Sequence, residues 1–433
     1  MAVDQKLVDR LQLEVGDEVT EKITQIQASG RDVASEDERQ IAQALIQDKI
    51  RRLAERSLER GLHPMTREEE VELSSEVFNR IYGLGRIQAL IDDPRISNIH
   101  INGCDNVHVV YSDGTKTKVP AVAPNDRALV DMISSAARRV GRSERRWDDA
   151  NPSVDVQLPD GSRLNAVQGI TDRPMISIRC HDFGLNQVKH LEEVEMFDSL
   201  MGDFLRAVVE ARLTLVVAGA TNAGKTTLLR CLLNEITPTE RIITIEDNLE
   251  LGLDRFPERH PDLVTYETRS ANTEGRGAID MSYCLRASLR QNPNRVVVGE
   301  VRGKEVVEMV RAMSQGNEGS MCSIHADSSS HAIERMILYM SEAGVEEETA
   351  FRWIPSAVDL IIHVGYTTDR EPKRTITSVR EVLSGEGDLV ATNEVWVPGP
   401  NNSAVPAPAA GVSSSLSEKL RRVGFDMART GVL

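Results

Sequence analysis

The 433-residue sequence is poor in aromatic residues and in positive charge. Aromatic residues make up 4% of the chain, and 67 acidic against 51 basic side chains give a formal net charge of −16. Nucleic-acid backbones bind basic surfaces, and single strands stack on aromatic rings. We therefore expect no nucleic-acid partner.

Long apolar runs and paired cysteines are also missing. The longest apolar runs, 213–218 and 360–363 with their flanks, fall far short of the roughly 20 residues that a membrane-spanning helix needs. The N-terminal stretch MAVDQKLVDRLQLEVGDE has no apolar core, so we expect no secretory signal. The five cysteines are scattered and never spaced C-x-x-C, which argues against a disulfide framework or a zinc site. These absences predict a cytoplasmic protein with reduced thiols.

The most informative stretch is 213–236, which reads LTLVVAGATNAGKTTLLRCLLNEI. Its first six residues are apolar and branched without alternation, as in a buried parallel strand. Residues 226–236 are compatible with a helix, which Pro238 would end. Between strand and helix, four residues match the phosphate-loop spacing G-x-x-x-x-G-K-[ST]: Gly219, Gly224, Lys225 and Thr226.

A loop of this kind binds a polyphosphate through backbone N–H groups at a helix N-terminus. Gly219 and Gly224 would allow close backbone approach, Lys225 would reach the β- and γ-phosphates, and the Thr226 hydroxyl would ligate Mg²⁺. We therefore expect ATP and Mg²⁺ as ligands. The residues expected to bind the nucleotide are Gly219, Ala220, Thr221, Asn222, Ala223, Gly224, Lys225, Thr226 and Thr227.

Three more short apolar runs end in polar side chains. The run 241–245 is followed by Glu246, 295–298 by Gly299 and Glu300, and 321–324 by His325. Because ligands of open α/β sheets bind at the carboxyl ends of the strands, we expect these side chains to surround the phosphate loop. The pattern predicts an α/β nucleotide-binding domain over 184–398.

Hydrolysis of a γ-phosphate requires a metal, charge compensation and a positioned water molecule. Gly299 occupies the position where many phosphate-loop ATPases have a metal-binding aspartate. Glu246 and Glu300 would therefore share the metal-water and base roles, and the sequence leaves open which of them is the base. Glu300 would join Thr226 at Mg²⁺, directly or through water. His325 would either sense the γ-phosphate or bond a neighbouring backbone group.

The remaining parts of the chain have different compositions. Residues 1–84 are charged and helical in pattern, with capping boxes beginning at Ser35 and Thr66. Residues 85–183 alternate as short strands around a helix that starts near Asn125 and ends at Gly141, which predicts a small α+β (PAS-like) domain. Residues 399–433 contain NNSAVPAPAAGVSSS, typical of a flexible linker, before a short amphipathic helix that we interpret as a tail.

Four motifs in order resemble those of the type II/type IV secretion ATPase superfamily of pilus and secretion motors. They are GATNAGKTT, an aspartate box TIEDNLEL (244–251), a variant Walker B VVVGEVR (296–302) and a histidine box GNEGSMCSIHADS (316–328). The resemblance implies a RecA-like motor domain and a homo-hexamer with nucleotide between the two domains. On that basis Arg163 and Arg179 look like the arginines that reach the γ-phosphate and join the catalytic set Lys225, Glu246, Glu300 and His325.

Upstream, GLGRIQALIDDPRISNIHING (83–103) and VDVQLPDGSRLNAV (154–167) are similar to the CpaF-like branch of tight-adherence (Flp) pilus assembly ATPases. That branch implies ATP-driven assembly through polytopic inner-membrane platform proteins, with membrane association only through these partners at the inner face of the membrane. The sequence has no tetracysteine zinc module, which fits this branch, and the tail after Pro398 has no counterpart in it.

Two other functions stay open at this point. A nucleic-acid translocase or helicase also uses RecA-like rings, although the acidic charge disfavours it. A nucleotide-sensing scaffold would bind ATP without hydrolysing it. DNA-stimulated turnover would support the first, and a lack of hydrolysis would support the second.

Overall fold

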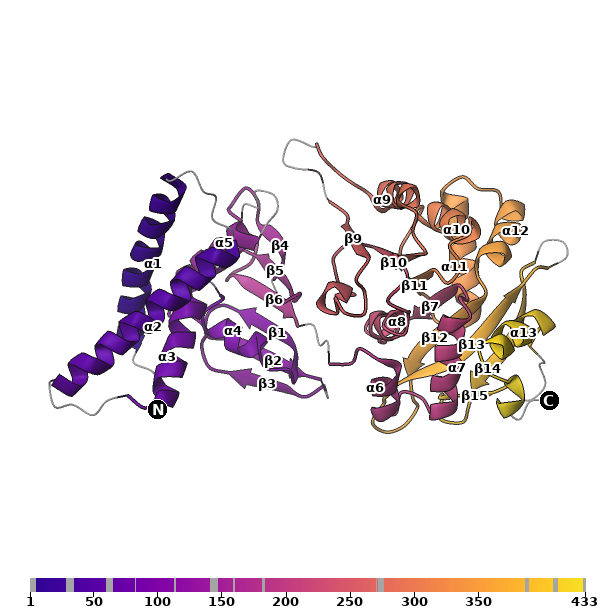
Figure 1. The fold of residues 1–433 in the computed structure, drawn as a ribbon, viewed down its shortest axis with the longest axis horizontal. Coiled ribbons are helices and arrows are strands. Elements are labelled where there is room, and N and C mark those ends of the chain that lie inside the picture. Colours follow the sequence, from indigo (N-terminus) through magenta and orange to yellow (C-terminus); the bar gives the residue numbers. More distant parts are fainter. Residues whose placement is uncertain are drawn as a thin grey trace. The chain divides into compact units, whose positions relative to one another are not determined.

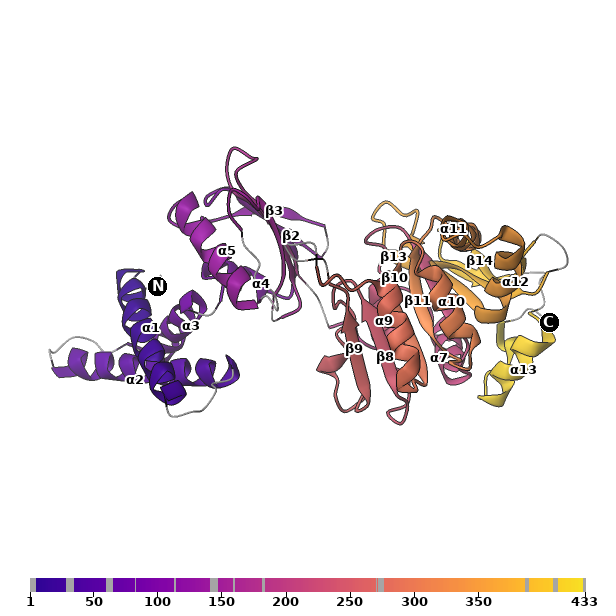
Figure 2. The same ribbon diagram turned by 90° about the horizontal axis from the view of Figure 1, so that it is seen from above.

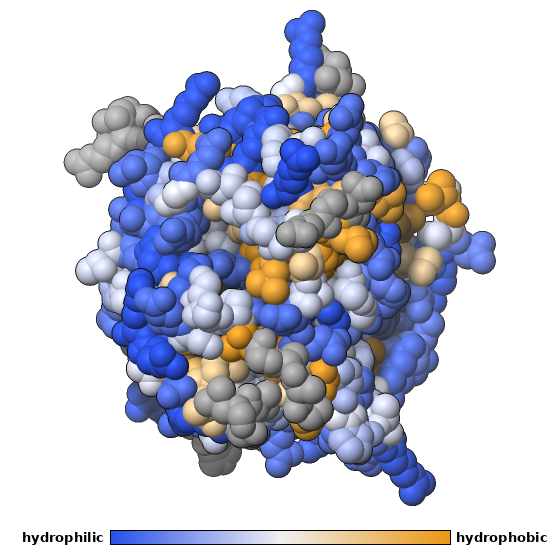
Figure 3. Space-filling view, turned by 90° about the vertical axis from the view of Figure 1, so that its right-hand side faces the viewer, coloured by the Kyte–Doolittle hydropathy of each residue, from blue (hydrophilic) through white to orange (hydrophobic). Residues whose placement is uncertain are grey.

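The computed structural model describes residues 5–28, 35–59, 65–81, 83–112, 114–140, 147–158, 160–180, 184–269, 271, 276–385, 389–407 and 412–430. The chain divides into two compact units, Met1–Asp182 and Phe183–Leu433 (Figure 1). Among the described residues, no helix combines the length and the apolar character needed to cross a lipid bilayer. The face drawn in Figure 3 is mostly hydrophilic, with apolar patches between polar side chains.

The first unit begins with three helices that share a core. The capping box at Thr66 forms as expected, because Glu69 N–H donates to Thr66 Oγ1 at 3.2 Å and Thr66 N–H donates to Glu69 Oε2 at 2.8 Å. The side chains of the box at Ser35 lie outside the described residues. The helices are α1 (Gln5–Ala28), α2 (Ser35–Glu59) and α3 (Arg67–Ile81), and their buried residues include Val8, Leu11, Val15, Ile46, Ile50 and Val77.

The rest of the first unit is an antiparallel sheet in the order β3-β2-β1-β6-β5-β4. Alternate strand residues such as Ile99, Ile101 and Ile178 pack against α5, whose first turn is capped by Asn125 through Ala128 N–H at 2.9 Å. The elements are α4 (Arg86–Ile91), β1 (Ile96–Asn102), β2 (Val107–Tyr111), β3 (Lys116–Val119), α5 (Asp126–Val140), β4 (Ser153–Gln157), β5 (Arg163–Val167) and β6 (Met175–Arg179).

The second unit is built on a nine-stranded sheet in the order β15-β14-β13-β12-β7-β11-β10-β8-β9. The strands from β12 to β9 in this order are parallel, and β13 to β15 extend the sheet in antiparallel fashion. The strands are β7 (Leu215–Gly219), β8 (Ile242–Glu246), β9 (Leu263–Glu267), β10 (Arg295–Val301), β11 (Met321–His325), β12 (Leu360–Tyr366), β13 (Arg374–Leu383), β14 (Ala391–Pro398) and β15 (Ala404–Pro406).

Helices cover both faces of this sheet (Figures 1 and 2). Leu215 and Val217 of β7 face one core, which includes α6, α7, α8 and α13, whereas Val216 and Ala218 face a second core with α9 to α12. Burial on both faces explains the unbroken apolar run of β7. The helices are α6 (Val188–Glu193), α7 (Ser199–Glu210), α8 (Lys225–Leu233), η1 (Leu253–Arg255), α9 (Met281–Ser288), η2 (Leu289–Gln291), α10 (Val306–Ser314), α11 (Ser329–Glu342), α12 (Glu347–Ala357), α13 (Ser414–Arg422) and η3 (Met427–Thr430).

Two expectations are wrong in detail. Strand β10 does not end before Gly299 but continues to Val301, with a shift in its pairing to β11 between Val298 and Val301. The segment after Pro398 is not a free linker over its described residues, because β15 pairs with β14. Helix α13 also packs into the core that contains the tilted rings of Phe204 and Trp396, whose centroids are 4.2 Å apart.

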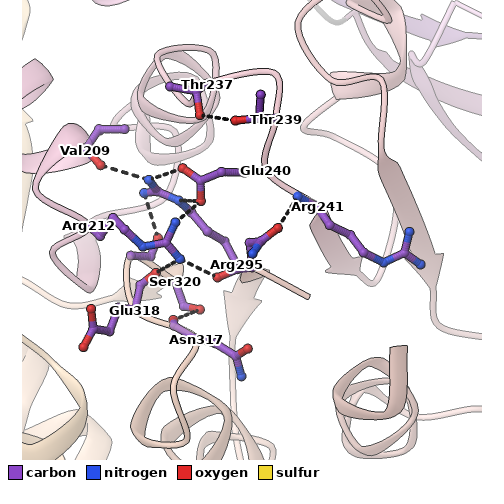
Figure 4. Close-up of polar contacts among 12 residues, drawn as sticks. Val209, Arg212, Thr237, Thr239, Glu240, Arg241, Arg295, Asn317, Glu318 and Ser320 are labelled. Carbon is purple, nitrogen blue, oxygen red and sulfur yellow. Dashed lines mark hydrogen bonds and ion pairs between the residues drawn. The ribbon is translucent and has the colours of Figure 1, made fainter. Parts of the chain in front are cut away.

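A buried cluster of charged residues links the segments that precede β7 and β8 to the start of β10, at the amino-terminal edge of the parallel strands (Figure 4). Arg295, 1% exposed, donates to Glu240 through Nε and Nη2, at 2.9 and 2.8 Å, and to the Val209 carbonyl at 3.0 Å. Arg212 pairs with the same carboxylate and donates to the carbonyls of Asn294 and Glu318 at 3.0 Å. Because this edge is opposite to the one that carries the phosphate loop, the cluster serves the fold.

Candidate functional site

The phosphate loop connects the end of β7 to the start of α8. A Cβ at Gly219 would collide with the Val364 carbonyl oxygen, and Gly224 has φ of 103°, in the left-handed region where glycine carries no steric penalty. Both glycines of the motif are therefore required by the backbone. Lys225 is the first residue of α8, where N–H groups without intrahelical partners meet the positive end of the helix dipole.

The Lys225 side chain points back under this loop. It is 7% exposed, and its Nζ donates to the carbonyls of Gly219 and Ala220, each at 3.0 Å, and to His325 Nδ1 at 3.1 Å. The cation is thus held where the loop carbonyls and the end of β11 meet. A buried lysine at a helix N-terminus is chemically suited to a phosphate group.

His325 connects Lys225 to Glu300. An ammonium group can only donate, so Nδ1 of the imidazole accepts and the proton lies on Nε2, which is in close contact with Glu300 Oε1 and can donate to it. Burial lowers the pKa of His325, Glu300 opposes this shift, and Lys225 and Arg302 add to it. The imidazole is therefore neutral at neutral pH. It accepts a hydrogen bond from Lys225 and faces Glu300 with its N–H group, so it links these two residues.

Glu246 is the last residue of β8 and is 3% exposed. Its Oε1 accepts hydrogen bonds from the N–H groups of Glu250 at 2.9 Å and Leu251 at 3.0 Å. A Cβ at Gly299 would lie 2.8 Å from Glu246 Cγ and 3.2 Å from its Oε1. The glycine that replaces the usual strand-end aspartate thus leaves room for Glu246.

Two residues join the site that the sequence had not singled out. Glu250 Oε2 accepts a hydrogen bond from the Thr226 hydroxyl at 3.3 Å. Arg302 donates from Nε to Glu300 Oε2 at 2.6 Å, and its Nη1 lies 3.6 Å from Asp247. Both residues lie inside the aspartate-box and Walker B segments, so the motifs mark the two segments although not these contacts.

The structure thus brings most of the predicted site residues of the second unit together at one sheet edge. Lys225, His325 and Glu300 form one hydrogen-bonded chain, while Glu246 reaches the loop through Glu250. The two predicted arginines belong to the first unit, where they occupy paired positions on neighbouring strands; these are Arg163 on β5 and Arg179 on β6. Their approach to a nucleotide stays a prediction.

The polar side chains around the phosphate loop fit a metal ion only together with a further ligand. In the described part of the chain, no group of three or more His, Cys, Asp or Glu side chains could hold a metal ion by itself. The Thr226 hydroxyl and the carboxylates of Glu250 and Glu300 nevertheless supply oxygen ligands, which Mg²⁺ prefers and usually completes with phosphate oxygens and water. The residues present therefore fit Mg²⁺ bound together with a nucleotide.

Solved structures with the same fold include an ATPase and a pilus retraction motor. The Legionella pneumophila ATPase DotB has a TM-score of 0.50 and 18% identity, covering 69% of this chain and 80% of DotB. The pilus retraction motor PilT with bound ADP has a TM-score of 0.50 and 20% identity, covering 67% of this chain and 81% of PilT. At these identities the likeness supports the fold alone, a RecA-like domain preceded by an N-terminal domain.

Sequence comparison identifies the family. The model of the type II/IV secretion system protein family matches residues 82–379. A putative conjugal transfer protein of Mycobacterium tuberculosis is 31% identical over 322 residues, covering 72% of this chain and 88% of the relative. Protein VirB11 of Agrobacterium fabrum is 30% identical over 342 residues, covering 71% of this chain and 90% of the relative. With its phosphate loop and the polar residues around it, the chain belongs to the type II/IV secretion system ATPase family.

Proposed function

We propose that this protein hydrolyses ATP with Mg²⁺ and uses the energy to drive pilus assembly or protein secretion. The observation that carries the proposal is the hydrogen-bonded chain from Lys225 through His325 to Glu300, which joins α8, β11 and β10 beside the phosphate loop. A glycine-rich loop that served only to connect a strand to a helix would not require this series of hydrogen-bonded side chains.

The residues divide the work as follows. Lys225 and the loop N–H groups hold the β- and γ-phosphates of the substrate, and Mg²⁺ at Thr226 compensates their charge. Glu300 orients and deprotonates the attacking water, and His325 and Arg302 keep its carboxylate in place. We assign Glu246 a supporting role. Its Oε1 already accepts hydrogen bonds from the backbone N–H groups of Glu250 and Leu251, and these bonds hold the segment 250–251 in place.

The test is phosphate release by the full chain, with binding of a fluorescent ATP analogue measured in parallel. Glu300→Gln keeps the shape of the side chain but removes the base, so we expect turnover to fall about 10²- to 10⁴-fold while nucleotide still binds. Lys225→Ala should weaken binding itself. Glu348→Gln is the matched control, since Glu348 is exposed and pairs with Arg352 one helical turn away on α12.

The outcomes separate the alternatives. Full turnover in Glu300→Gln would refute the assignment of Glu300 as the base. If the wild-type protein binds the ATP analogue tightly but does not hydrolyse ATP, the nucleotide-sensing scaffold is favoured. Stimulation of turnover by DNA at low salt would favour a translocase.

Within the family we assign the chain to the CpaF-like branch, working as a cytoplasmic homo-hexamer on polytopic inner-membrane platform proteins. Family membership and the upstream segments 83–103 and 154–167 support this assignment. Arginine fingers contribute about 10³- to 10⁵-fold in rate where they act. Unchanged turnover in Arg163→Ala would refute an interdomain role for Arg163, and light scattering with and without ATP would test the hexamer.

A further inference from the structure

The phosphate loop contains one residue other than glycine at positive φ, and neighbouring side chains hold its carbonyl group. Asn222, at the tip of the loop, has φ of 64°, in the left-handed region that asparagine enters more readily than most side chains but less readily than glycine. Its carbonyl oxygen accepts two hydrogen bonds, from Tyr366 Oη at 2.9 Å and from Arg374 Nε at 3.1 Å. Two donors on one carbonyl at this point suggest a function for both side chains.

Both donors come from the hairpin formed by β12 and β13. Tyr366 is the last residue of β12 and Arg374 the first of β13, and β12 pairs directly with β7, the strand that leads into the loop. The hairpin also touches the loop at its two glycines, because a Cβ at Gly219 would strike Val364 O and a Cβ at Gly224 would lie 3.3 Å from Arg374 Cδ. The hairpin therefore contacts the loop at its start, tip and end.

The hairpin is itself well fixed. Thr367 N–H donates to the Lys373 carbonyl at 2.8 Å, and Lys373 N–H donates back to Thr367 Oγ1 at 3.0 Å. Asn402 Nδ2 donates to the Tyr366 carbonyl at 2.7 Å, and Lys373 Nζ pairs with Glu195 at 2.6 Å. The two donors therefore lie on a hairpin whose own position is fixed by hydrogen bonds. From there they can fix the backbone conformation of the loop at Asn222.

We propose that Tyr366 and Arg374 are positioning residues that hold the Asn222 carbonyl and so keep the phosphate loop in its binding conformation. This inference rests on the nucleotide binding proposed above. A loop that is in its binding conformation only part of the time has an apparent affinity reduced by that fraction. Because one net hydrogen bond changes an equilibrium by roughly 2- to 10-fold, loss of either donor should weaken binding by about that factor.

The variants are Tyr366→Phe, Arg374→Met and the two together, with Tyr339→Phe on α11 as the matched control. We expect each single change to raise the Kd for a fluorescent ATP analogue and the KM for ATP by roughly 2- to 10-fold. The value of kcat at saturating ATP should change much less, since neither side chain is assigned to the chemical step. A kcat loss larger than the KM change would contradict a positioning role.

Addition of Asn222→Gly to the double variant is the decisive experiment. Glycine adopts positive φ even more readily than asparagine, so it should recover part of the affinity that the loss of both donors removes. Direct contact of Tyr366 or Arg374 with the nucleotide would not be rescued by a change in the loop backbone. Absence of rescue, or unchanged affinity in the double variant, would overturn the proposal.

Hydrogen–deuterium exchange without nucleotide separates this inference from the proposed function. The peptide covering 219–225 should exchange faster in the double variant than in wild type, and Asn222→Gly should slow it again. Thermal unfolding by circular dichroism checks that the variants fold. If wild type fails to bind ATP but the variants show the expected differences in exchange, the proposed function is wrong, whereas the proposal that Tyr366 and Arg374 hold the loop (the loop clamp) is supported. Equal exchange in all variants would refute the clamp.

Discussion

Glu240→Gln should destabilise the second unit strongly although it lies far from the chemistry. The change leaves a fully buried guanidinium, Arg295, without its counter-charge (Figure 4). Removal of one partner of a buried ion pair lowers the free energy of unfolding by about 3–5 kcal/mol, because the remaining charge stays desolvated. Arg212 is less affected, since it is one-third exposed and keeps two backbone carbonyls as acceptors.

The effect should depend on pH in a defined direction. Burial alone would raise the pKa of Glu240, but the hydrogen bonds and charges of Arg295 and Arg212 outweigh burial and lower the pKa below its ordinary 4.5. A carboxyl group whose folded-state pKa is lowered contributes stability above its unfolded pKa, and this contribution is lost as pH falls through the folded value. The difference between wild type and Glu240→Gln should thus be constant near neutral pH and shrink below pH 4.5.

Urea denaturation followed by tryptophan fluorescence measures this difference. Trp353 and Trp396 report on the second unit, and a Trp147→Phe background removes the signal of the first. A double variant, Glu240→Leu with Arg295→Met, should recover most of the loss, because apolar replacements of a buried pair are often close to neutral. A loss below about 1 kcal/mol in Glu240→Gln would show that the buried charge is solvated and refute the reasoning.

Three further predictions follow from the site and the core. Gly299→Ala should reduce turnover at least about tenfold, measured by phosphate release, because the new methyl group displaces Glu246, whose Cγ is 2.8 Å away. Because burial lowers the pKa of His325 below its usual 6.5, turnover should be flat between about pH 7 and 8 and fall only at more acid pH; the turnover that His325→Asn retains should lack the part of this fall that comes from His325. Leu420→Ala, which removes a fully buried side chain of α13, should lower the unfolding free energy by about 2–5 kcal/mol, whereas Leu389→Ala, 73% exposed, should change it by less than about 0.5 kcal/mol in the same urea titration.

The parts of the fold that could be predicted are those whose signal is local. The apolar runs around β7, β8 and β11 are buried on both faces, so their sequences reveal them as strands. The phosphate loop was predictable because its glycines are required by the backbone. Glu246 and His325 could be placed because each directly ends a recognisable strand.

The parts that were missed depend on long-range contacts. The extension of β10 through Gly299 and Glu300 is stabilised by pairing with β11, against the low strand preference of glycine and glutamate. The segment Ala404–Pro406 has a linker-like composition, yet pairing with β14 makes it a strand. The contact of Glu250 with Thr226 spans 24 residues, and no spacing rule reveals it.

Strand β7 lies at the centre of its sheet, and the strands on its two sides should tolerate different kinds of substitution. On one flank β11, β10 and β8 carry the groups to which the proposed mechanism assigns a charge or a proton transfer, so it predicts that Glu300 does not tolerate even glutamine. On the other flank the described contacts of the β12–β13 hairpin with the loop are hydrogen bonds and close packing. A saturation mutagenesis library should therefore tolerate alternative donors at Tyr366 and Arg374 while permitting almost no exchange at Glu300 and His325.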